Sequence, residues 1–559
     1  MSKIYRNTDF PSPDFPRLDL LTLLFESPDC RAEDQTPLHC VAGTGASLIN
    51  KRDLSDLTQR LAYALRHRYG IGSNGPDRDV VTVLSFGQPM VAAVLFGVIA
   101  AGGVYSAATP SSTTAELVRY LNICNSRLIM CSSEFKDVVM RAAKEFGLSS
   151  DRILVFESTP EWTVSPLNGS GSILTENRLH WETITDVSRL KESLIVILWS
   201  SGTTGFPKGV KLSHQNLVSE THLTSLPSRE FAQQAAQKGI QMPPYRALAH
   251  LPISHIAGLF AYLIAPFYAG GQVFWMRKYE WHKMLQFVKQ HEITLFYTVP
   301  SIYLRISKSP DVRDHFRSVV SAVTGAAPMD GELQKAASSR LGAGETVIGQ
   351  TWGLSETTGA VTIMPPGKSD ATGSISPLVP GVEIRLVDED YRDVEPGQPG
   401  ELLVRGPMVT NGYYNDPKAT AAAFYKDWFC TGDIAVWRDG LFYIVDRKKE
   451  ILKYKGQQVS PAELEALLIT HPSIQEAAVI GIRDPSDPTS DLPRSYVVAD
   501  PGEISADQVK AYVSKNLSAS KQLRGGVVFV KELPKNAVGK ILRRELRDQA
   551  GRESARPKL

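Results

Sequence analysis

Residues 193–198 (SLIVIL) run directly into residues 199–209 (WSSGTTGFPKG). The first segment is short, apolar and rich in β-branched residues, which predicts a buried strand. The second holds four hydroxyl side chains, three glycines and one lysine within eleven residues. Glycines let the backbone approach a polyphosphate and turn N–H groups toward it, while hydroxyls and an ammonium add donors and charge. The two segments therefore predict a phosphate-binding loop that leaves a rigid sheet.

This loop differs from the Walker loop of other nucleotide-binding proteins. A Walker loop needs Gly-Lys followed by Ser or Thr, whereas Lys208 follows Pro207 and precedes Gly209. A surface turn rich in Gly and Ser is the plainer alternative, but such a turn rarely combines so many donors with a core strand. The predicted phosphate contacts are Ser200, Ser201, Gly202, Thr203, Thr204, Gly205 and Lys208.

Length and composition restrict the class of protein. The 559 residues are 43% hydrophobic and 21% charged, as in ordinary globular domains, and exceed what one hydrophobic core usually serves. A net charge of +2 disfavours nucleic acid or a membrane as the main partner. The five cysteines show no metal-binding spacing, so we expect free thiols in a reducing compartment.

Targeting signals are weak. The N-terminus is acidic and proline-containing, which predicts neither a signal peptide nor a transit peptide. The longest apolar run, residues 90–105, is too short to span a bilayer and predicts a buried helix, so we expect no transmembrane segment. Pro557-Lys558-Leu559 resembles an atypical peroxisomal address, the alternative being a basic tail that ends in leucine by accident. We expect a peroxisomal or cytoplasmic protein.

The order of patterns predicts two domains. Up to about residue 445, apolar strands alternate with helical stretches, which is typical of α/β layers, and residues 381–387 and 400–405 add a β-rich subdomain. Residues 441–445 predict a last strand, and a charged break at 446–450 follows it. Ser460-Pro461-Ala462-Glu463 is a capping box that starts a helix of a small α+β unit. We expect a large multi-layer α/β domain at 1–445 and a small mobile α+β lid domain at 446–559.

Seven motifs in this order resemble those of the adenylate-forming superfamily, which includes acyl-CoA synthetases, 4-coumarate-CoA ligases, firefly luciferases and peptide-synthetase adenylation domains. The resemblance begins near residue 35 and covers nearly all of the rest. Its motifs are the loop above and residues 251–255 (LPISH), 324–328 (TGAAP), 349–357 (GQTWGLSET), 431–433 (TGD), 446–463 and 534–542 (PKNAVGKIL).

The resemblance implies a two-step reaction. A carboxylate attacks the α-phosphate of ATP, expels pyrophosphate and forms an acyl-adenylate, and the thiol of CoA then attacks that mixed anhydride. Both steps develop negative charge, so the protein must supply aligned donors and cations more than proton transfer. ATP, Mg²⁺ and CoA are the cofactors implied.

The resemblance also implies a role for each matching residue. Lys540 would stabilise the charge on the α-phosphate, Glu356 would bind Mg²⁺, Asp433 and Arg447 would contact the ribose or phosphates, and Lys449 would be the hinge. Further ATP contacts are implied at Gly325, Ala326, Ala327, Gln350, Thr351, Trp352 and Gly353. Trp352 would offer a flat face to adenine, and the strand-like segment 324–327 would form the other wall. The implied acyl-pocket residues are Ser254, His255, Ala257, Gly258, Thr351, Gly359 and Ala360. Thioester formation would use Lys453, Lys455, Gly456 and Gln458.

Several of these residues have plainer interpretations. Glu356 could be a solvated or capping carboxylate, and Asp433 could be a turn residue. Trp352 and His255 could simply pack in a core. The basic residues of 447–455 could form a solvated face or a nucleic-acid patch, although the acidic residues among them argue against the latter.

Two departures from the family leave the acid open. Thr351 stands where plant 4-coumarate ligases have glycine, so a cinnamate preference does not carry over. Ser520 stands where many relatives place an aromatic residue. An aryl or medium-to-long acyl chain fits the small residues, and the acceptor is CoA or, alternatively, the phosphopantetheine of a carrier protein. A regulatory nucleotide-binding protein without catalysis is disfavoured because Glu356 and Lys540 are both present.

Overall fold

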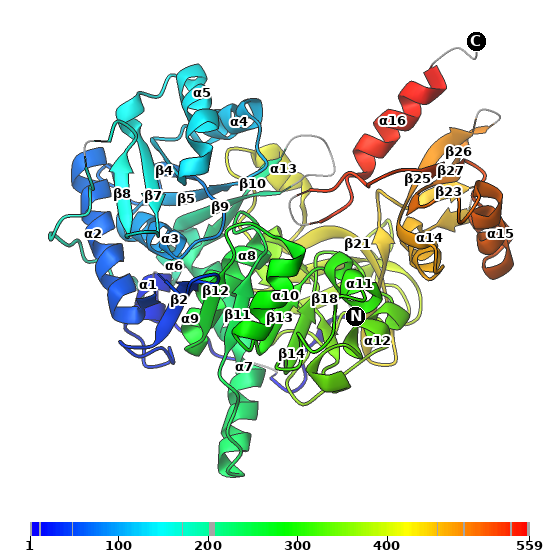
Figure 1. The fold of residues 1–559 in the computed structure, drawn as a ribbon, viewed down its shortest axis with the longest axis horizontal. Helices are drawn as coiled ribbons and strands as arrows, with labels where there is room; N and C mark the ends of the chain where they lie inside the picture. Colours follow the sequence, from blue (N-terminus) through cyan, green and yellow to red (C-terminus); the bar gives the residue numbers. More distant parts are fainter. Residues whose placement is uncertain are drawn as a thin grey trace.

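A computed structural model describes residues 3–10, 13–46, 48–169, 171–200, 207–454, 457–484, 487–536 and 539–555 (Figure 1). Some predicted site residues lie outside these ranges: Ser201, Gly202, Thr203, Thr204, Gly205, Lys455 and Gly456, together with the C-terminal tripeptide. Within the described ranges, the search for a helix long and apolar enough to cross a bilayer finds no candidate.

The first of two seven-stranded sheets contains the predicted strand before the phosphate loop. Its central strands are parallel, and its two edge strands, β10 and β8, are antiparallel to their neighbours. In spatial order the strands are β10 (Lys208–Ser213), β9 (Leu194–Ser200), β5 (Val104–Ala108), β4 (Val80–Leu84), β6 (Leu128–Cys131), β7 (Ile153–Glu157) and β8 (Thr163–Pro166). The prediction of a buried strand at 193–198 is confirmed by β9.

Helices cover both faces of this sheet because successive strand residues point to opposite sides. Met130 packs in the core shared with α2 (Lys51–Tyr69) and α3 (Met90–Ala100), whereas its neighbour Ile129 packs against α4 (Thr114–Cys124) and α5 (Lys136–Phe146). Helix α3 is buried along its whole length, which confirms the predicted core helix, and it ends at Ala100 before β5 begins.

The second seven-stranded sheet is parallel apart from one short edge strand, β3. Its order is β15 (Ile348–Gln350), β14 (Ser321–Thr324), β13 (Leu295–Thr298), β11 (Arg246–Ala249), β12 (Gln272–Trp275), β2 (Pro37–Val41) and β3 (Ile49–Asn50). One face packs on α10 (Trp281–Gln290), α11 (Pro300–Lys308) and α12 (Gly331–Ser338). The other shares the core of the first sheet, with α1 (Leu20–Phe25), α7 (His214–Gln237), α8 (Ile256–Leu259) and α9 (Ala265–Ala269).

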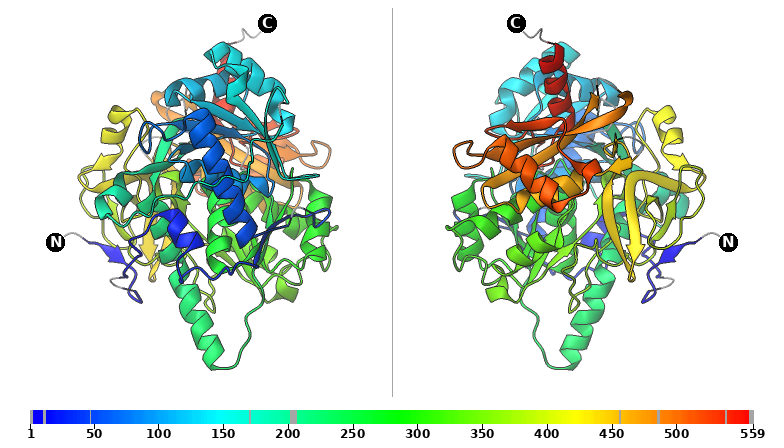
Figure 2. Two further views of the ribbon diagram at one scale, coloured as in Figure 1. Left: turned by 90° about the vertical axis from the view of Figure 1, so that its left-hand side faces the viewer. Right: turned by 90° about the vertical axis from the view of Figure 1, so that its right-hand side faces the viewer.

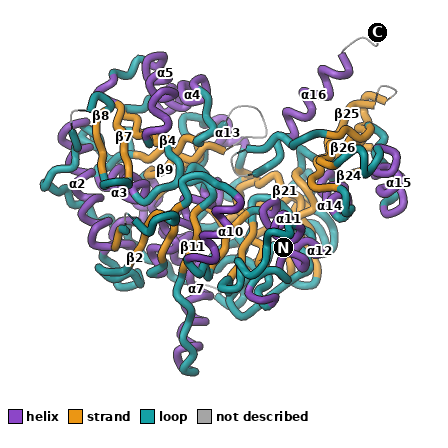
Figure 3. Tube along the Cα trace, viewed as in Figure 1, coloured by secondary structure: helices purple, strands orange, loops and turns teal. Residues whose placement is uncertain are grey.

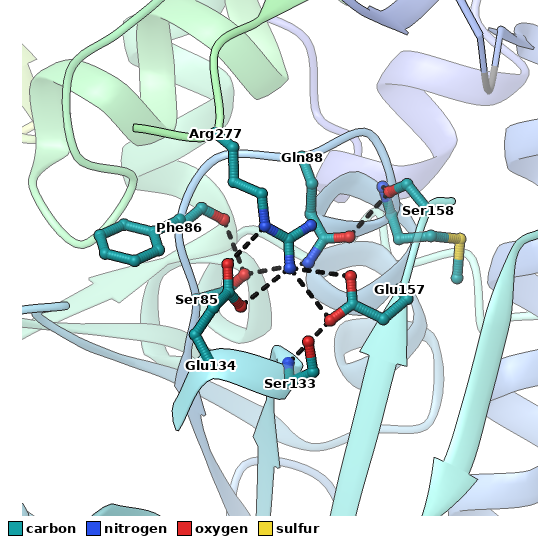
Figure 4. A network of polar contacts seen from close by, with 9 residues as sticks. Ser85, Phe86, Gln88, Ser133, Glu134, Glu157, Ser158 and Arg277 are labelled. Atoms are coloured by element: carbon teal, nitrogen blue, oxygen red, sulfur yellow. Dashed lines mark hydrogen bonds and ion pairs between the residues drawn. The ribbon is translucent and has the colours of Figure 1, made fainter. Parts of the chain in front are cut away.

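A polar network also joins the two sheets (Figure 4). Arg277 follows β12 of the second sheet, and its guanidinium Nη2 lies 2.8 Å from a carboxylate oxygen of Glu134 and 2.8 Å from one of Glu157, at the end of β7 of the first sheet. Glu157 in turn accepts from the backbone N–H of Ser133 at 2.7 Å. The two layers are therefore held by charge-assisted hydrogen bonds as well as by apolar packing.

An antiparallel sheet forms the predicted β-rich subdomain. Its strands are β1 (Tyr5–Arg6), β18 (Glu383–Val387), β19 (Gly400–Arg405), β21 (Trp428–Arg438) and β20 (Phe424–Tyr425), with β22 (Leu441–Arg447) paired to β21. A small hairpin, β16 (Gly353–Leu354) with β17 (Gly359–Ala360), and helix α13 (Pro417–Ala422) complete this part of the chain, whereas helix α6 (Val187–Glu192) directly precedes β9 and contacts α7 and β10.

The last part of the chain forms a small α+β unit set to one side of the larger body (Figures 2 and 3). It contains the hairpin β23 (Leu452–Tyr454) with β24 (Gln457–Val459) and the sheet β25 (Ile474–Asp484), β26 (Asp487–Ala499) and β27 (Gly526–Phe529). Its helices are α14 (Pro461–Ile469), α15 (Ala506–Asn516) and α16 (Arg543–Ala555). The mixed α/β class and the small C-terminal domain are as predicted.

Three local predictions need correction. Strand β22 runs to Arg447, so the expected break after residue 445 falls inside a strand, because pairing with β21 continues to Asp433. The strand-like segment 324–327 is a strand only up to Thr324. Ser460 caps α14 by accepting from the N–H of Glu463 at 3.3 Å, but the reciprocal half of the capping box is replaced by an ion pair between Glu463 and Lys521 at 2.5 Å.

Candidate active site

Two neighbouring strands of the second sheet end in loops that carry predicted site residues. Strands β14 and β15 are parallel, so their carboxyl ends, where α/β sheets usually bind ligands, lie side by side. The buried side-chain amide of Gln350 donates to the carbonyl of Met329 at 2.8 Å and accepts from its N–H at 3.1 Å. Gln350 therefore positions the loop after β14, which contains Gly325, Ala326 and Ala327.

Asp433 is a buried carboxylate held from two sides. It lies in β21 and is only 4% exposed. The indole Nε1–H of Trp352 donates to Oδ2 at 2.9 Å, and Nε of Arg447, its cross-strand partner, lies 3.0 Å from Oδ1. Trp352 is itself buried. Trp352, which we expected to offer a face to adenine, thus uses its ring N–H to orient Asp433, the residue predicted to bind the ribose.

Lys540 comes from the C-terminal part of the chain and reaches the same place. Burial lowers the pKa of Lys540 to about 8, and the charge of Arg447 adds to this shift while that of Asp433 opposes it. Burial and then the charge of Lys540 lower the pKa of His255 to about 4. The charge of Lys540 is therefore coupled to Arg447, Asp433 and His255, which belong to the large body or to its last strand.

The ends of the predicted phosphate loop are held together by one strand pair. Ser200, the last residue of β9, is in register with Lys208, the first residue of β10. The ammonium of Lys208 lies 5.0 Å from the ring centre of Tyr413, a cation–π distance. The hydroxyl of Tyr413 donates to Oε1 of Glu356 at 3.0 Å, and burial, followed by the charge of Glu356, raises the pKa of Tyr413. Glu356 and the phosphate loop are therefore linked through one tyrosine.

The sequence analysis missed Tyr413. It stands in a loop that is tied to β10 by backbone hydrogen bonds, from Lys211 to Gly412 at 3.1 Å and from Tyr414 to Gly209 at 2.7 Å. The local sequence, residues 411–415 (NGYYN), predicts only a turn. Only the position of the loop in space shows that one of its aromatic side chains lies between Lys208 and Glu356.

His255 begins helix α8 as its N-cap, with its Nδ1 3.4 Å from the N–H of Ala257. The nearby Gly258 is required by packing, because a Cβ at that position would lie 2.2 Å from the carbonyl oxygen of Pro252. Ser254, directly before His255, is partly buried. The small residues that we expected to open an acyl pocket here therefore serve at least partly to let the helix lie against its own preceding loop.

A second group of acyl-pocket candidates lies in the β16–β17 hairpin or just before it. Gly353 is needed there because a Cβ would lie 1.6 Å from the carbonyl oxygen of Gly359. The Thr351 hydroxyl donates to the carbonyl of Thr362 at 2.6 Å, and this bond fixes the Thr351 side chain beside the hairpin. The N–H of Ala360 donates to the buried carboxyl of Glu220 in α7 at 2.7 Å. Glu220 was not among the residues predicted from the sequence.

Two of the four thioester candidates lie within the described residues. Lys453 and Gln458 are paired across the β23–β24 hairpin, and Lys453 is exposed, with its N–H donating to Asp491 at 3.1 Å. The charge that interacts with Asp433, the ribose candidate, is that of the adenylation candidate Lys540.

The predicted hinge, Lys449, lies between contacts to the two parts of the chain. On one side Arg447 pairs with Asp433, and the ammonium of Lys448 lies 2.7 Å from Glu401 of β19. On the other side Glu450 forms an ion pair with Arg547 of α16. The ionic contacts thus change from the large body to the small domain within three residues.

Mg²⁺ needs few protein ligands at such a site. The described residues contain no group of three or more His, Cys, Asp or Glu side chains that could hold a metal ion by themselves. Mg²⁺ is commonly held by one or two carboxylates together with substrate phosphates. Glu356 offers a second carboxylate oxygen beside the one that Tyr413 donates to, so the residues present fit Mg²⁺ bound with a nucleotide.

Sequence comparison identifies the family. The profile described as AMP-binding enzyme matches residues 33–414, and the profile of the C-terminal domain of AMP-binding enzymes matches residues 463–540. The chain belongs to the AMP-binding enzyme family. The resemblance drawn from the motifs is therefore confirmed, and the C-terminal match spans the segment that ends in Lys540.

Relatives of this AMP-binding enzyme cover nearly its whole length. A protein of Emericella nidulans assigned as an acyl-coenzyme A synthetase is 45% identical over 552 residues, which is 98% of this chain and 99% of the relative. A phenylacetyl-CoA ligase of Aspergillus niger is 33% identical over 96% of this chain and 98% of its own. A 4-coumarate–CoA ligase of Solanum tuberosum is 32% identical over 94% and 96%.

Solved structures share the fold of this AMP-binding enzyme. ATP-bound MatB from Rhodopseudomonas palustris superposes with a TM-score of 0.80 at 24% identity, over 95% of this chain and 98% of its own. A benzoate CoA ligase from Burkholderia xenovorans gives a TM-score of 0.78 at 22% identity, over 95% and 99%. At these identities the likeness concerns the fold alone, and it includes the small C-terminal domain.

Proposed function

We propose that this AMP-binding enzyme activates a hydrophobic carboxylic acid with ATP and transfers the acyl group to CoA, releasing AMP and pyrophosphate. The acid is of the aryl or the medium-to-long-chain type. The proposal is supported by Lys540, whose charge is coupled to His255, Arg447 and Asp433 although the residue belongs to the small domain. The acid–CoA ligases among the relatives support the same reaction class.

In the first step, Asp433 would accept hydrogen bonds from the ribose, held in place by Trp352 and Arg447. Lys540 would meet the carboxylate and the α-phosphate as charge builds on the phosphorus, and a partly desolvated ammonium stabilises such charge more strongly than a solvated one. The β9–β10 loop with Lys208 would hold the outer phosphates. The bond from the α-phosphate to pyrophosphate breaks as the carboxylate oxygen bonds to phosphorus.

Mg²⁺ would be held by Glu356 and, when bound, would neutralise phosphate charge. The hydroxyl of Tyr413 donates to the Glu356 carboxylate, and its ring lies next to the Lys208 ammonium. The Tyr413 side chain therefore orients both Glu356 and Lys208. The pKa of Tyr413 is raised, and the hydroxyl therefore remains a donor to Glu356 at neutral pH.

In the second step, we propose that the small domain rotates about Lys449 and presents the β23–β24 hairpin. Lys453, Lys455, Gly456 and Gln458 would then line the approach of the CoA thiol. The change of ionic partners, from the large body at Lys448 to the small domain at Glu450, supports a pivot at this point. The pivot lies within the charged break at 446–450 expected from the sequence.

Pyrophosphate release under Mg-ATP, measured over a panel of carboxylic acids, tests the reaction class. Activity with at least one acid, together with AMP as the nucleotide product, is expected. A panel without any pyrophosphate release would refute the proposal. Comparison of free CoA with a phosphopantetheinylated carrier protein as acceptor separates the proposed ligase from the acyl-AMP ligase that loads a carrier.

A further inference from the structure

A fully buried carboxyl packs against two predicted acyl-pocket residues and is only half satisfied. Glu220 lies in α7 and is 0% exposed. Its Oε1 accepts the N–H of Ala360 at 2.7 Å, whereas its Oε2 has no hydrogen-bond partner among the described residues. A buried polar atom without a partner costs free energy, so native proteins rarely keep one without a use.

The contacts of Glu220 place it at the acyl-pocket candidates. A Cβ added to Gly359, which has a φ of 131°, would lie 2.6 Å from Oε1 of Glu220. Any side chain at Gly359 would therefore collide with the carboxyl. Residues 359 and 360, both expected in the acyl pocket from the motifs, are thus the residues against which this carboxyl is packed.

Tyr297 of β13 connects Glu220 to the nucleotide side of the site. Burial, and after it the charge of Glu220, raises the pKa of Tyr297 to about 12. The Tyr297 hydroxyl lies beside the loop after β14, because a Cβ on Gly325 would be 3.2 Å from it and 3.0 Å from Cγ2 of Thr351. Tyr297 thus lies beside Gly325 and Thr351, and Glu220 beside Gly359 and Ala360, so both polar side chains border predicted pocket residues.

Burial raises the pKa of Glu220 well above its usual value, and the hydrogen bond from Ala360 opposes the shift only in part. Burial therefore favours the protonated form, in which a carboxyl carries an O–H donor and an acceptor oxygen. Oε1 is already engaged by Ala360, whereas Oε2 has no partner among the described residues and is the oxygen left to bind a further polar group.

We infer that the acid substrate carries an oxygen-containing group, such as a hydroxyl, on its end remote from the reacting carboxylate, and that Glu220 Oε2, beside Tyr297, binds this group. The inference rests on the proposed function, because it names the class of acid that the ligase takes. Glu220 is then a specificity-determining residue. A hydrocarbon analogue would leave the buried carboxyl without a partner, and sites built to bind a hydroxyl reject analogues that lack it.

The test uses pairs of acids that differ by one distal hydroxyl: 4-hydroxyphenylacetate with phenylacetate, 4-hydroxycinnamate with cinnamate, and ω-hydroxylated with plain medium-chain acids. Pyrophosphate release gives kcat/KM for each. In at least one pair, the intact enzyme should favour the hydroxylated acid by about 10- to 100-fold. Glu220→Gln, which keeps a donor and the shape, should retain the preference, and Glu220→Leu should reduce it to within about threefold.

Ser219→Ala is the matched control. Ser219 precedes Glu220 in α7, is equally buried and also has a hydroxyl with no hydrogen-bond partner among the described residues, so it makes no described hydrogen bond to the hairpin. This variant should leave the ratio unchanged. Thermal unfolding of each variant separates a loss of stability from a change of preference.

Binding of acyl-adenylate analogues gives a second measurement of the preference, which does not rely on the activity of Glu220→Leu. Sulfamoyl-adenosine analogues of each acid pair, titrated by calorimetry into the intact enzyme and into Glu220→Gln, should show tighter binding of the hydroxylated member in both. Ratios within threefold for every pair, or equal losses for both members in Glu220→Leu, would overturn the inference while leaving the ligase intact. Failure to activate any acid would refute the ligase itself, and the inference with it.

Discussion

The two parts of the site differ in what holds them. Asp433, Trp352 and Gln350 belong to the large body, where strand pairing and hydrogen bonds of 2.8–3.1 Å to neighbouring strands or loops fix their positions. Lys540 belongs to the small domain, and its place beside Asp433 depends on how the two parts pack. The positions of the first three residues depend on local structure, whereas the position of Lys540 depends on the arrangement of the domains. Substitutions in the two groups should therefore affect different kinetic constants or half-reactions.

Helix α11 of the large body contacts the small domain at two points. The ammonium of Lys308, at the end of α11, donates to the carbonyls of Ile469 and Ile474 at 3.1 and 2.9 Å, at the C-terminal end of α14 and just beyond it. Gly539, directly before Lys540, lies against Ser301 of α11, since a Cβ would be 3.3 Å from its Oγ. Interfaces of this kind permit domain motion, which suits a residue needed in one half-reaction only.

The largest expected effect comes from removing the mobile cation. Lys540→Ala should lower the rate of adenylation by about 100- to 1000-fold, because charge on the phosphorus loses a desolvated partner. Thioester formation from a supplied acyl-adenylate should be little changed. Pyrophosphate release and CoA acylation, measured separately, check this division.

Lys535→Ala is the control, since this lysine lies close by in the sequence but pairs with Glu476 inside the small domain at 2.5 Å. It should change neither half-reaction by more than about twofold. Equal losses in both half-reactions for Lys540→Ala would contradict the separation between a fixed and a mobile part.

The pH dependence of adenylation tests the role of Lys540 in the intact enzyme. With its pKa lowered to about 8, the ammonium is charged below that pH and neutral above it. The kcat/KM for adenylation should therefore be level below pH 8 and fall toward tenfold per unit above it. The same limb should be absent from Lys540→Arg, whose residual activity keeps a charged guanidinium at every pH tested. A decline at the same pH in the arginine variant would assign the limb to another group.

A smaller effect is expected in the fixed part. Trp352→Phe removes the indole donor and leaves Oδ2 of the buried Asp433 short of one hydrogen bond. The KM for ATP should rise by about 5- to 20-fold, through misorientation of the predicted ribose ligand, while kcat changes less. ATP-dependence of pyrophosphate release measures both constants.

Trp281→Phe is the matched control, because its indole also donates to an aspartate, Asp311, at 3.2 Å, but in the layer of α10. The KM for ATP should stay unchanged in that variant. A rise of equal size there would mean that Trp352 acts through general stability and not through Asp433.

The smallest expected effect concerns the contact between the parts. Lys308→Met removes two hydrogen bonds that hold α14 and should slow adenylation by about two- to fivefold, with thioester formation unaffected or faster. Stopped-flow adenylation and CoA acylation give the ratio. Lys289→Met, which breaks an exposed ion pair with Asp314 at 2.8 Å within the large body, should leave that ratio unchanged.

Much of the fold was predictable because its patterns are local. The strand before residue 199, the buried helix after residue 90, the strand at 400–405 and the N-cap at Ser460 all follow from short runs of side chains, and the structure confirms them. Strand ends were less predictable. Strand β22 continues through the charged Asp446 and Arg447 because its partner β21 continues beside it.

The candidate site shows the same limit. The motifs named Asp433, Trp352 and Glu356 but not the contacts among them. The bond from Trp352 to Asp433 spans 81 residues of sequence, that from Tyr413 to Glu356 spans 57, and that from Ala360 to Glu220 spans 140. Separations of this length have no periodicity by which a pattern could reveal them.

The amino-acid sequence by itself determined the family, the reaction class and the residue types that it needs, since a phosphate loop, an acidic ligand and a distant lysine are all visible as ordered motifs. The tertiary structure decided which groups meet. It turned Trp352 into a support for Asp433, made Tyr413 the link between Lys208 and Glu356, and left Glu220 half satisfied against two predicted acyl-pocket residues. The physical reason is that burial and hydrogen bonding depend on neighbours in space, which the order of residues along the chain does not specify.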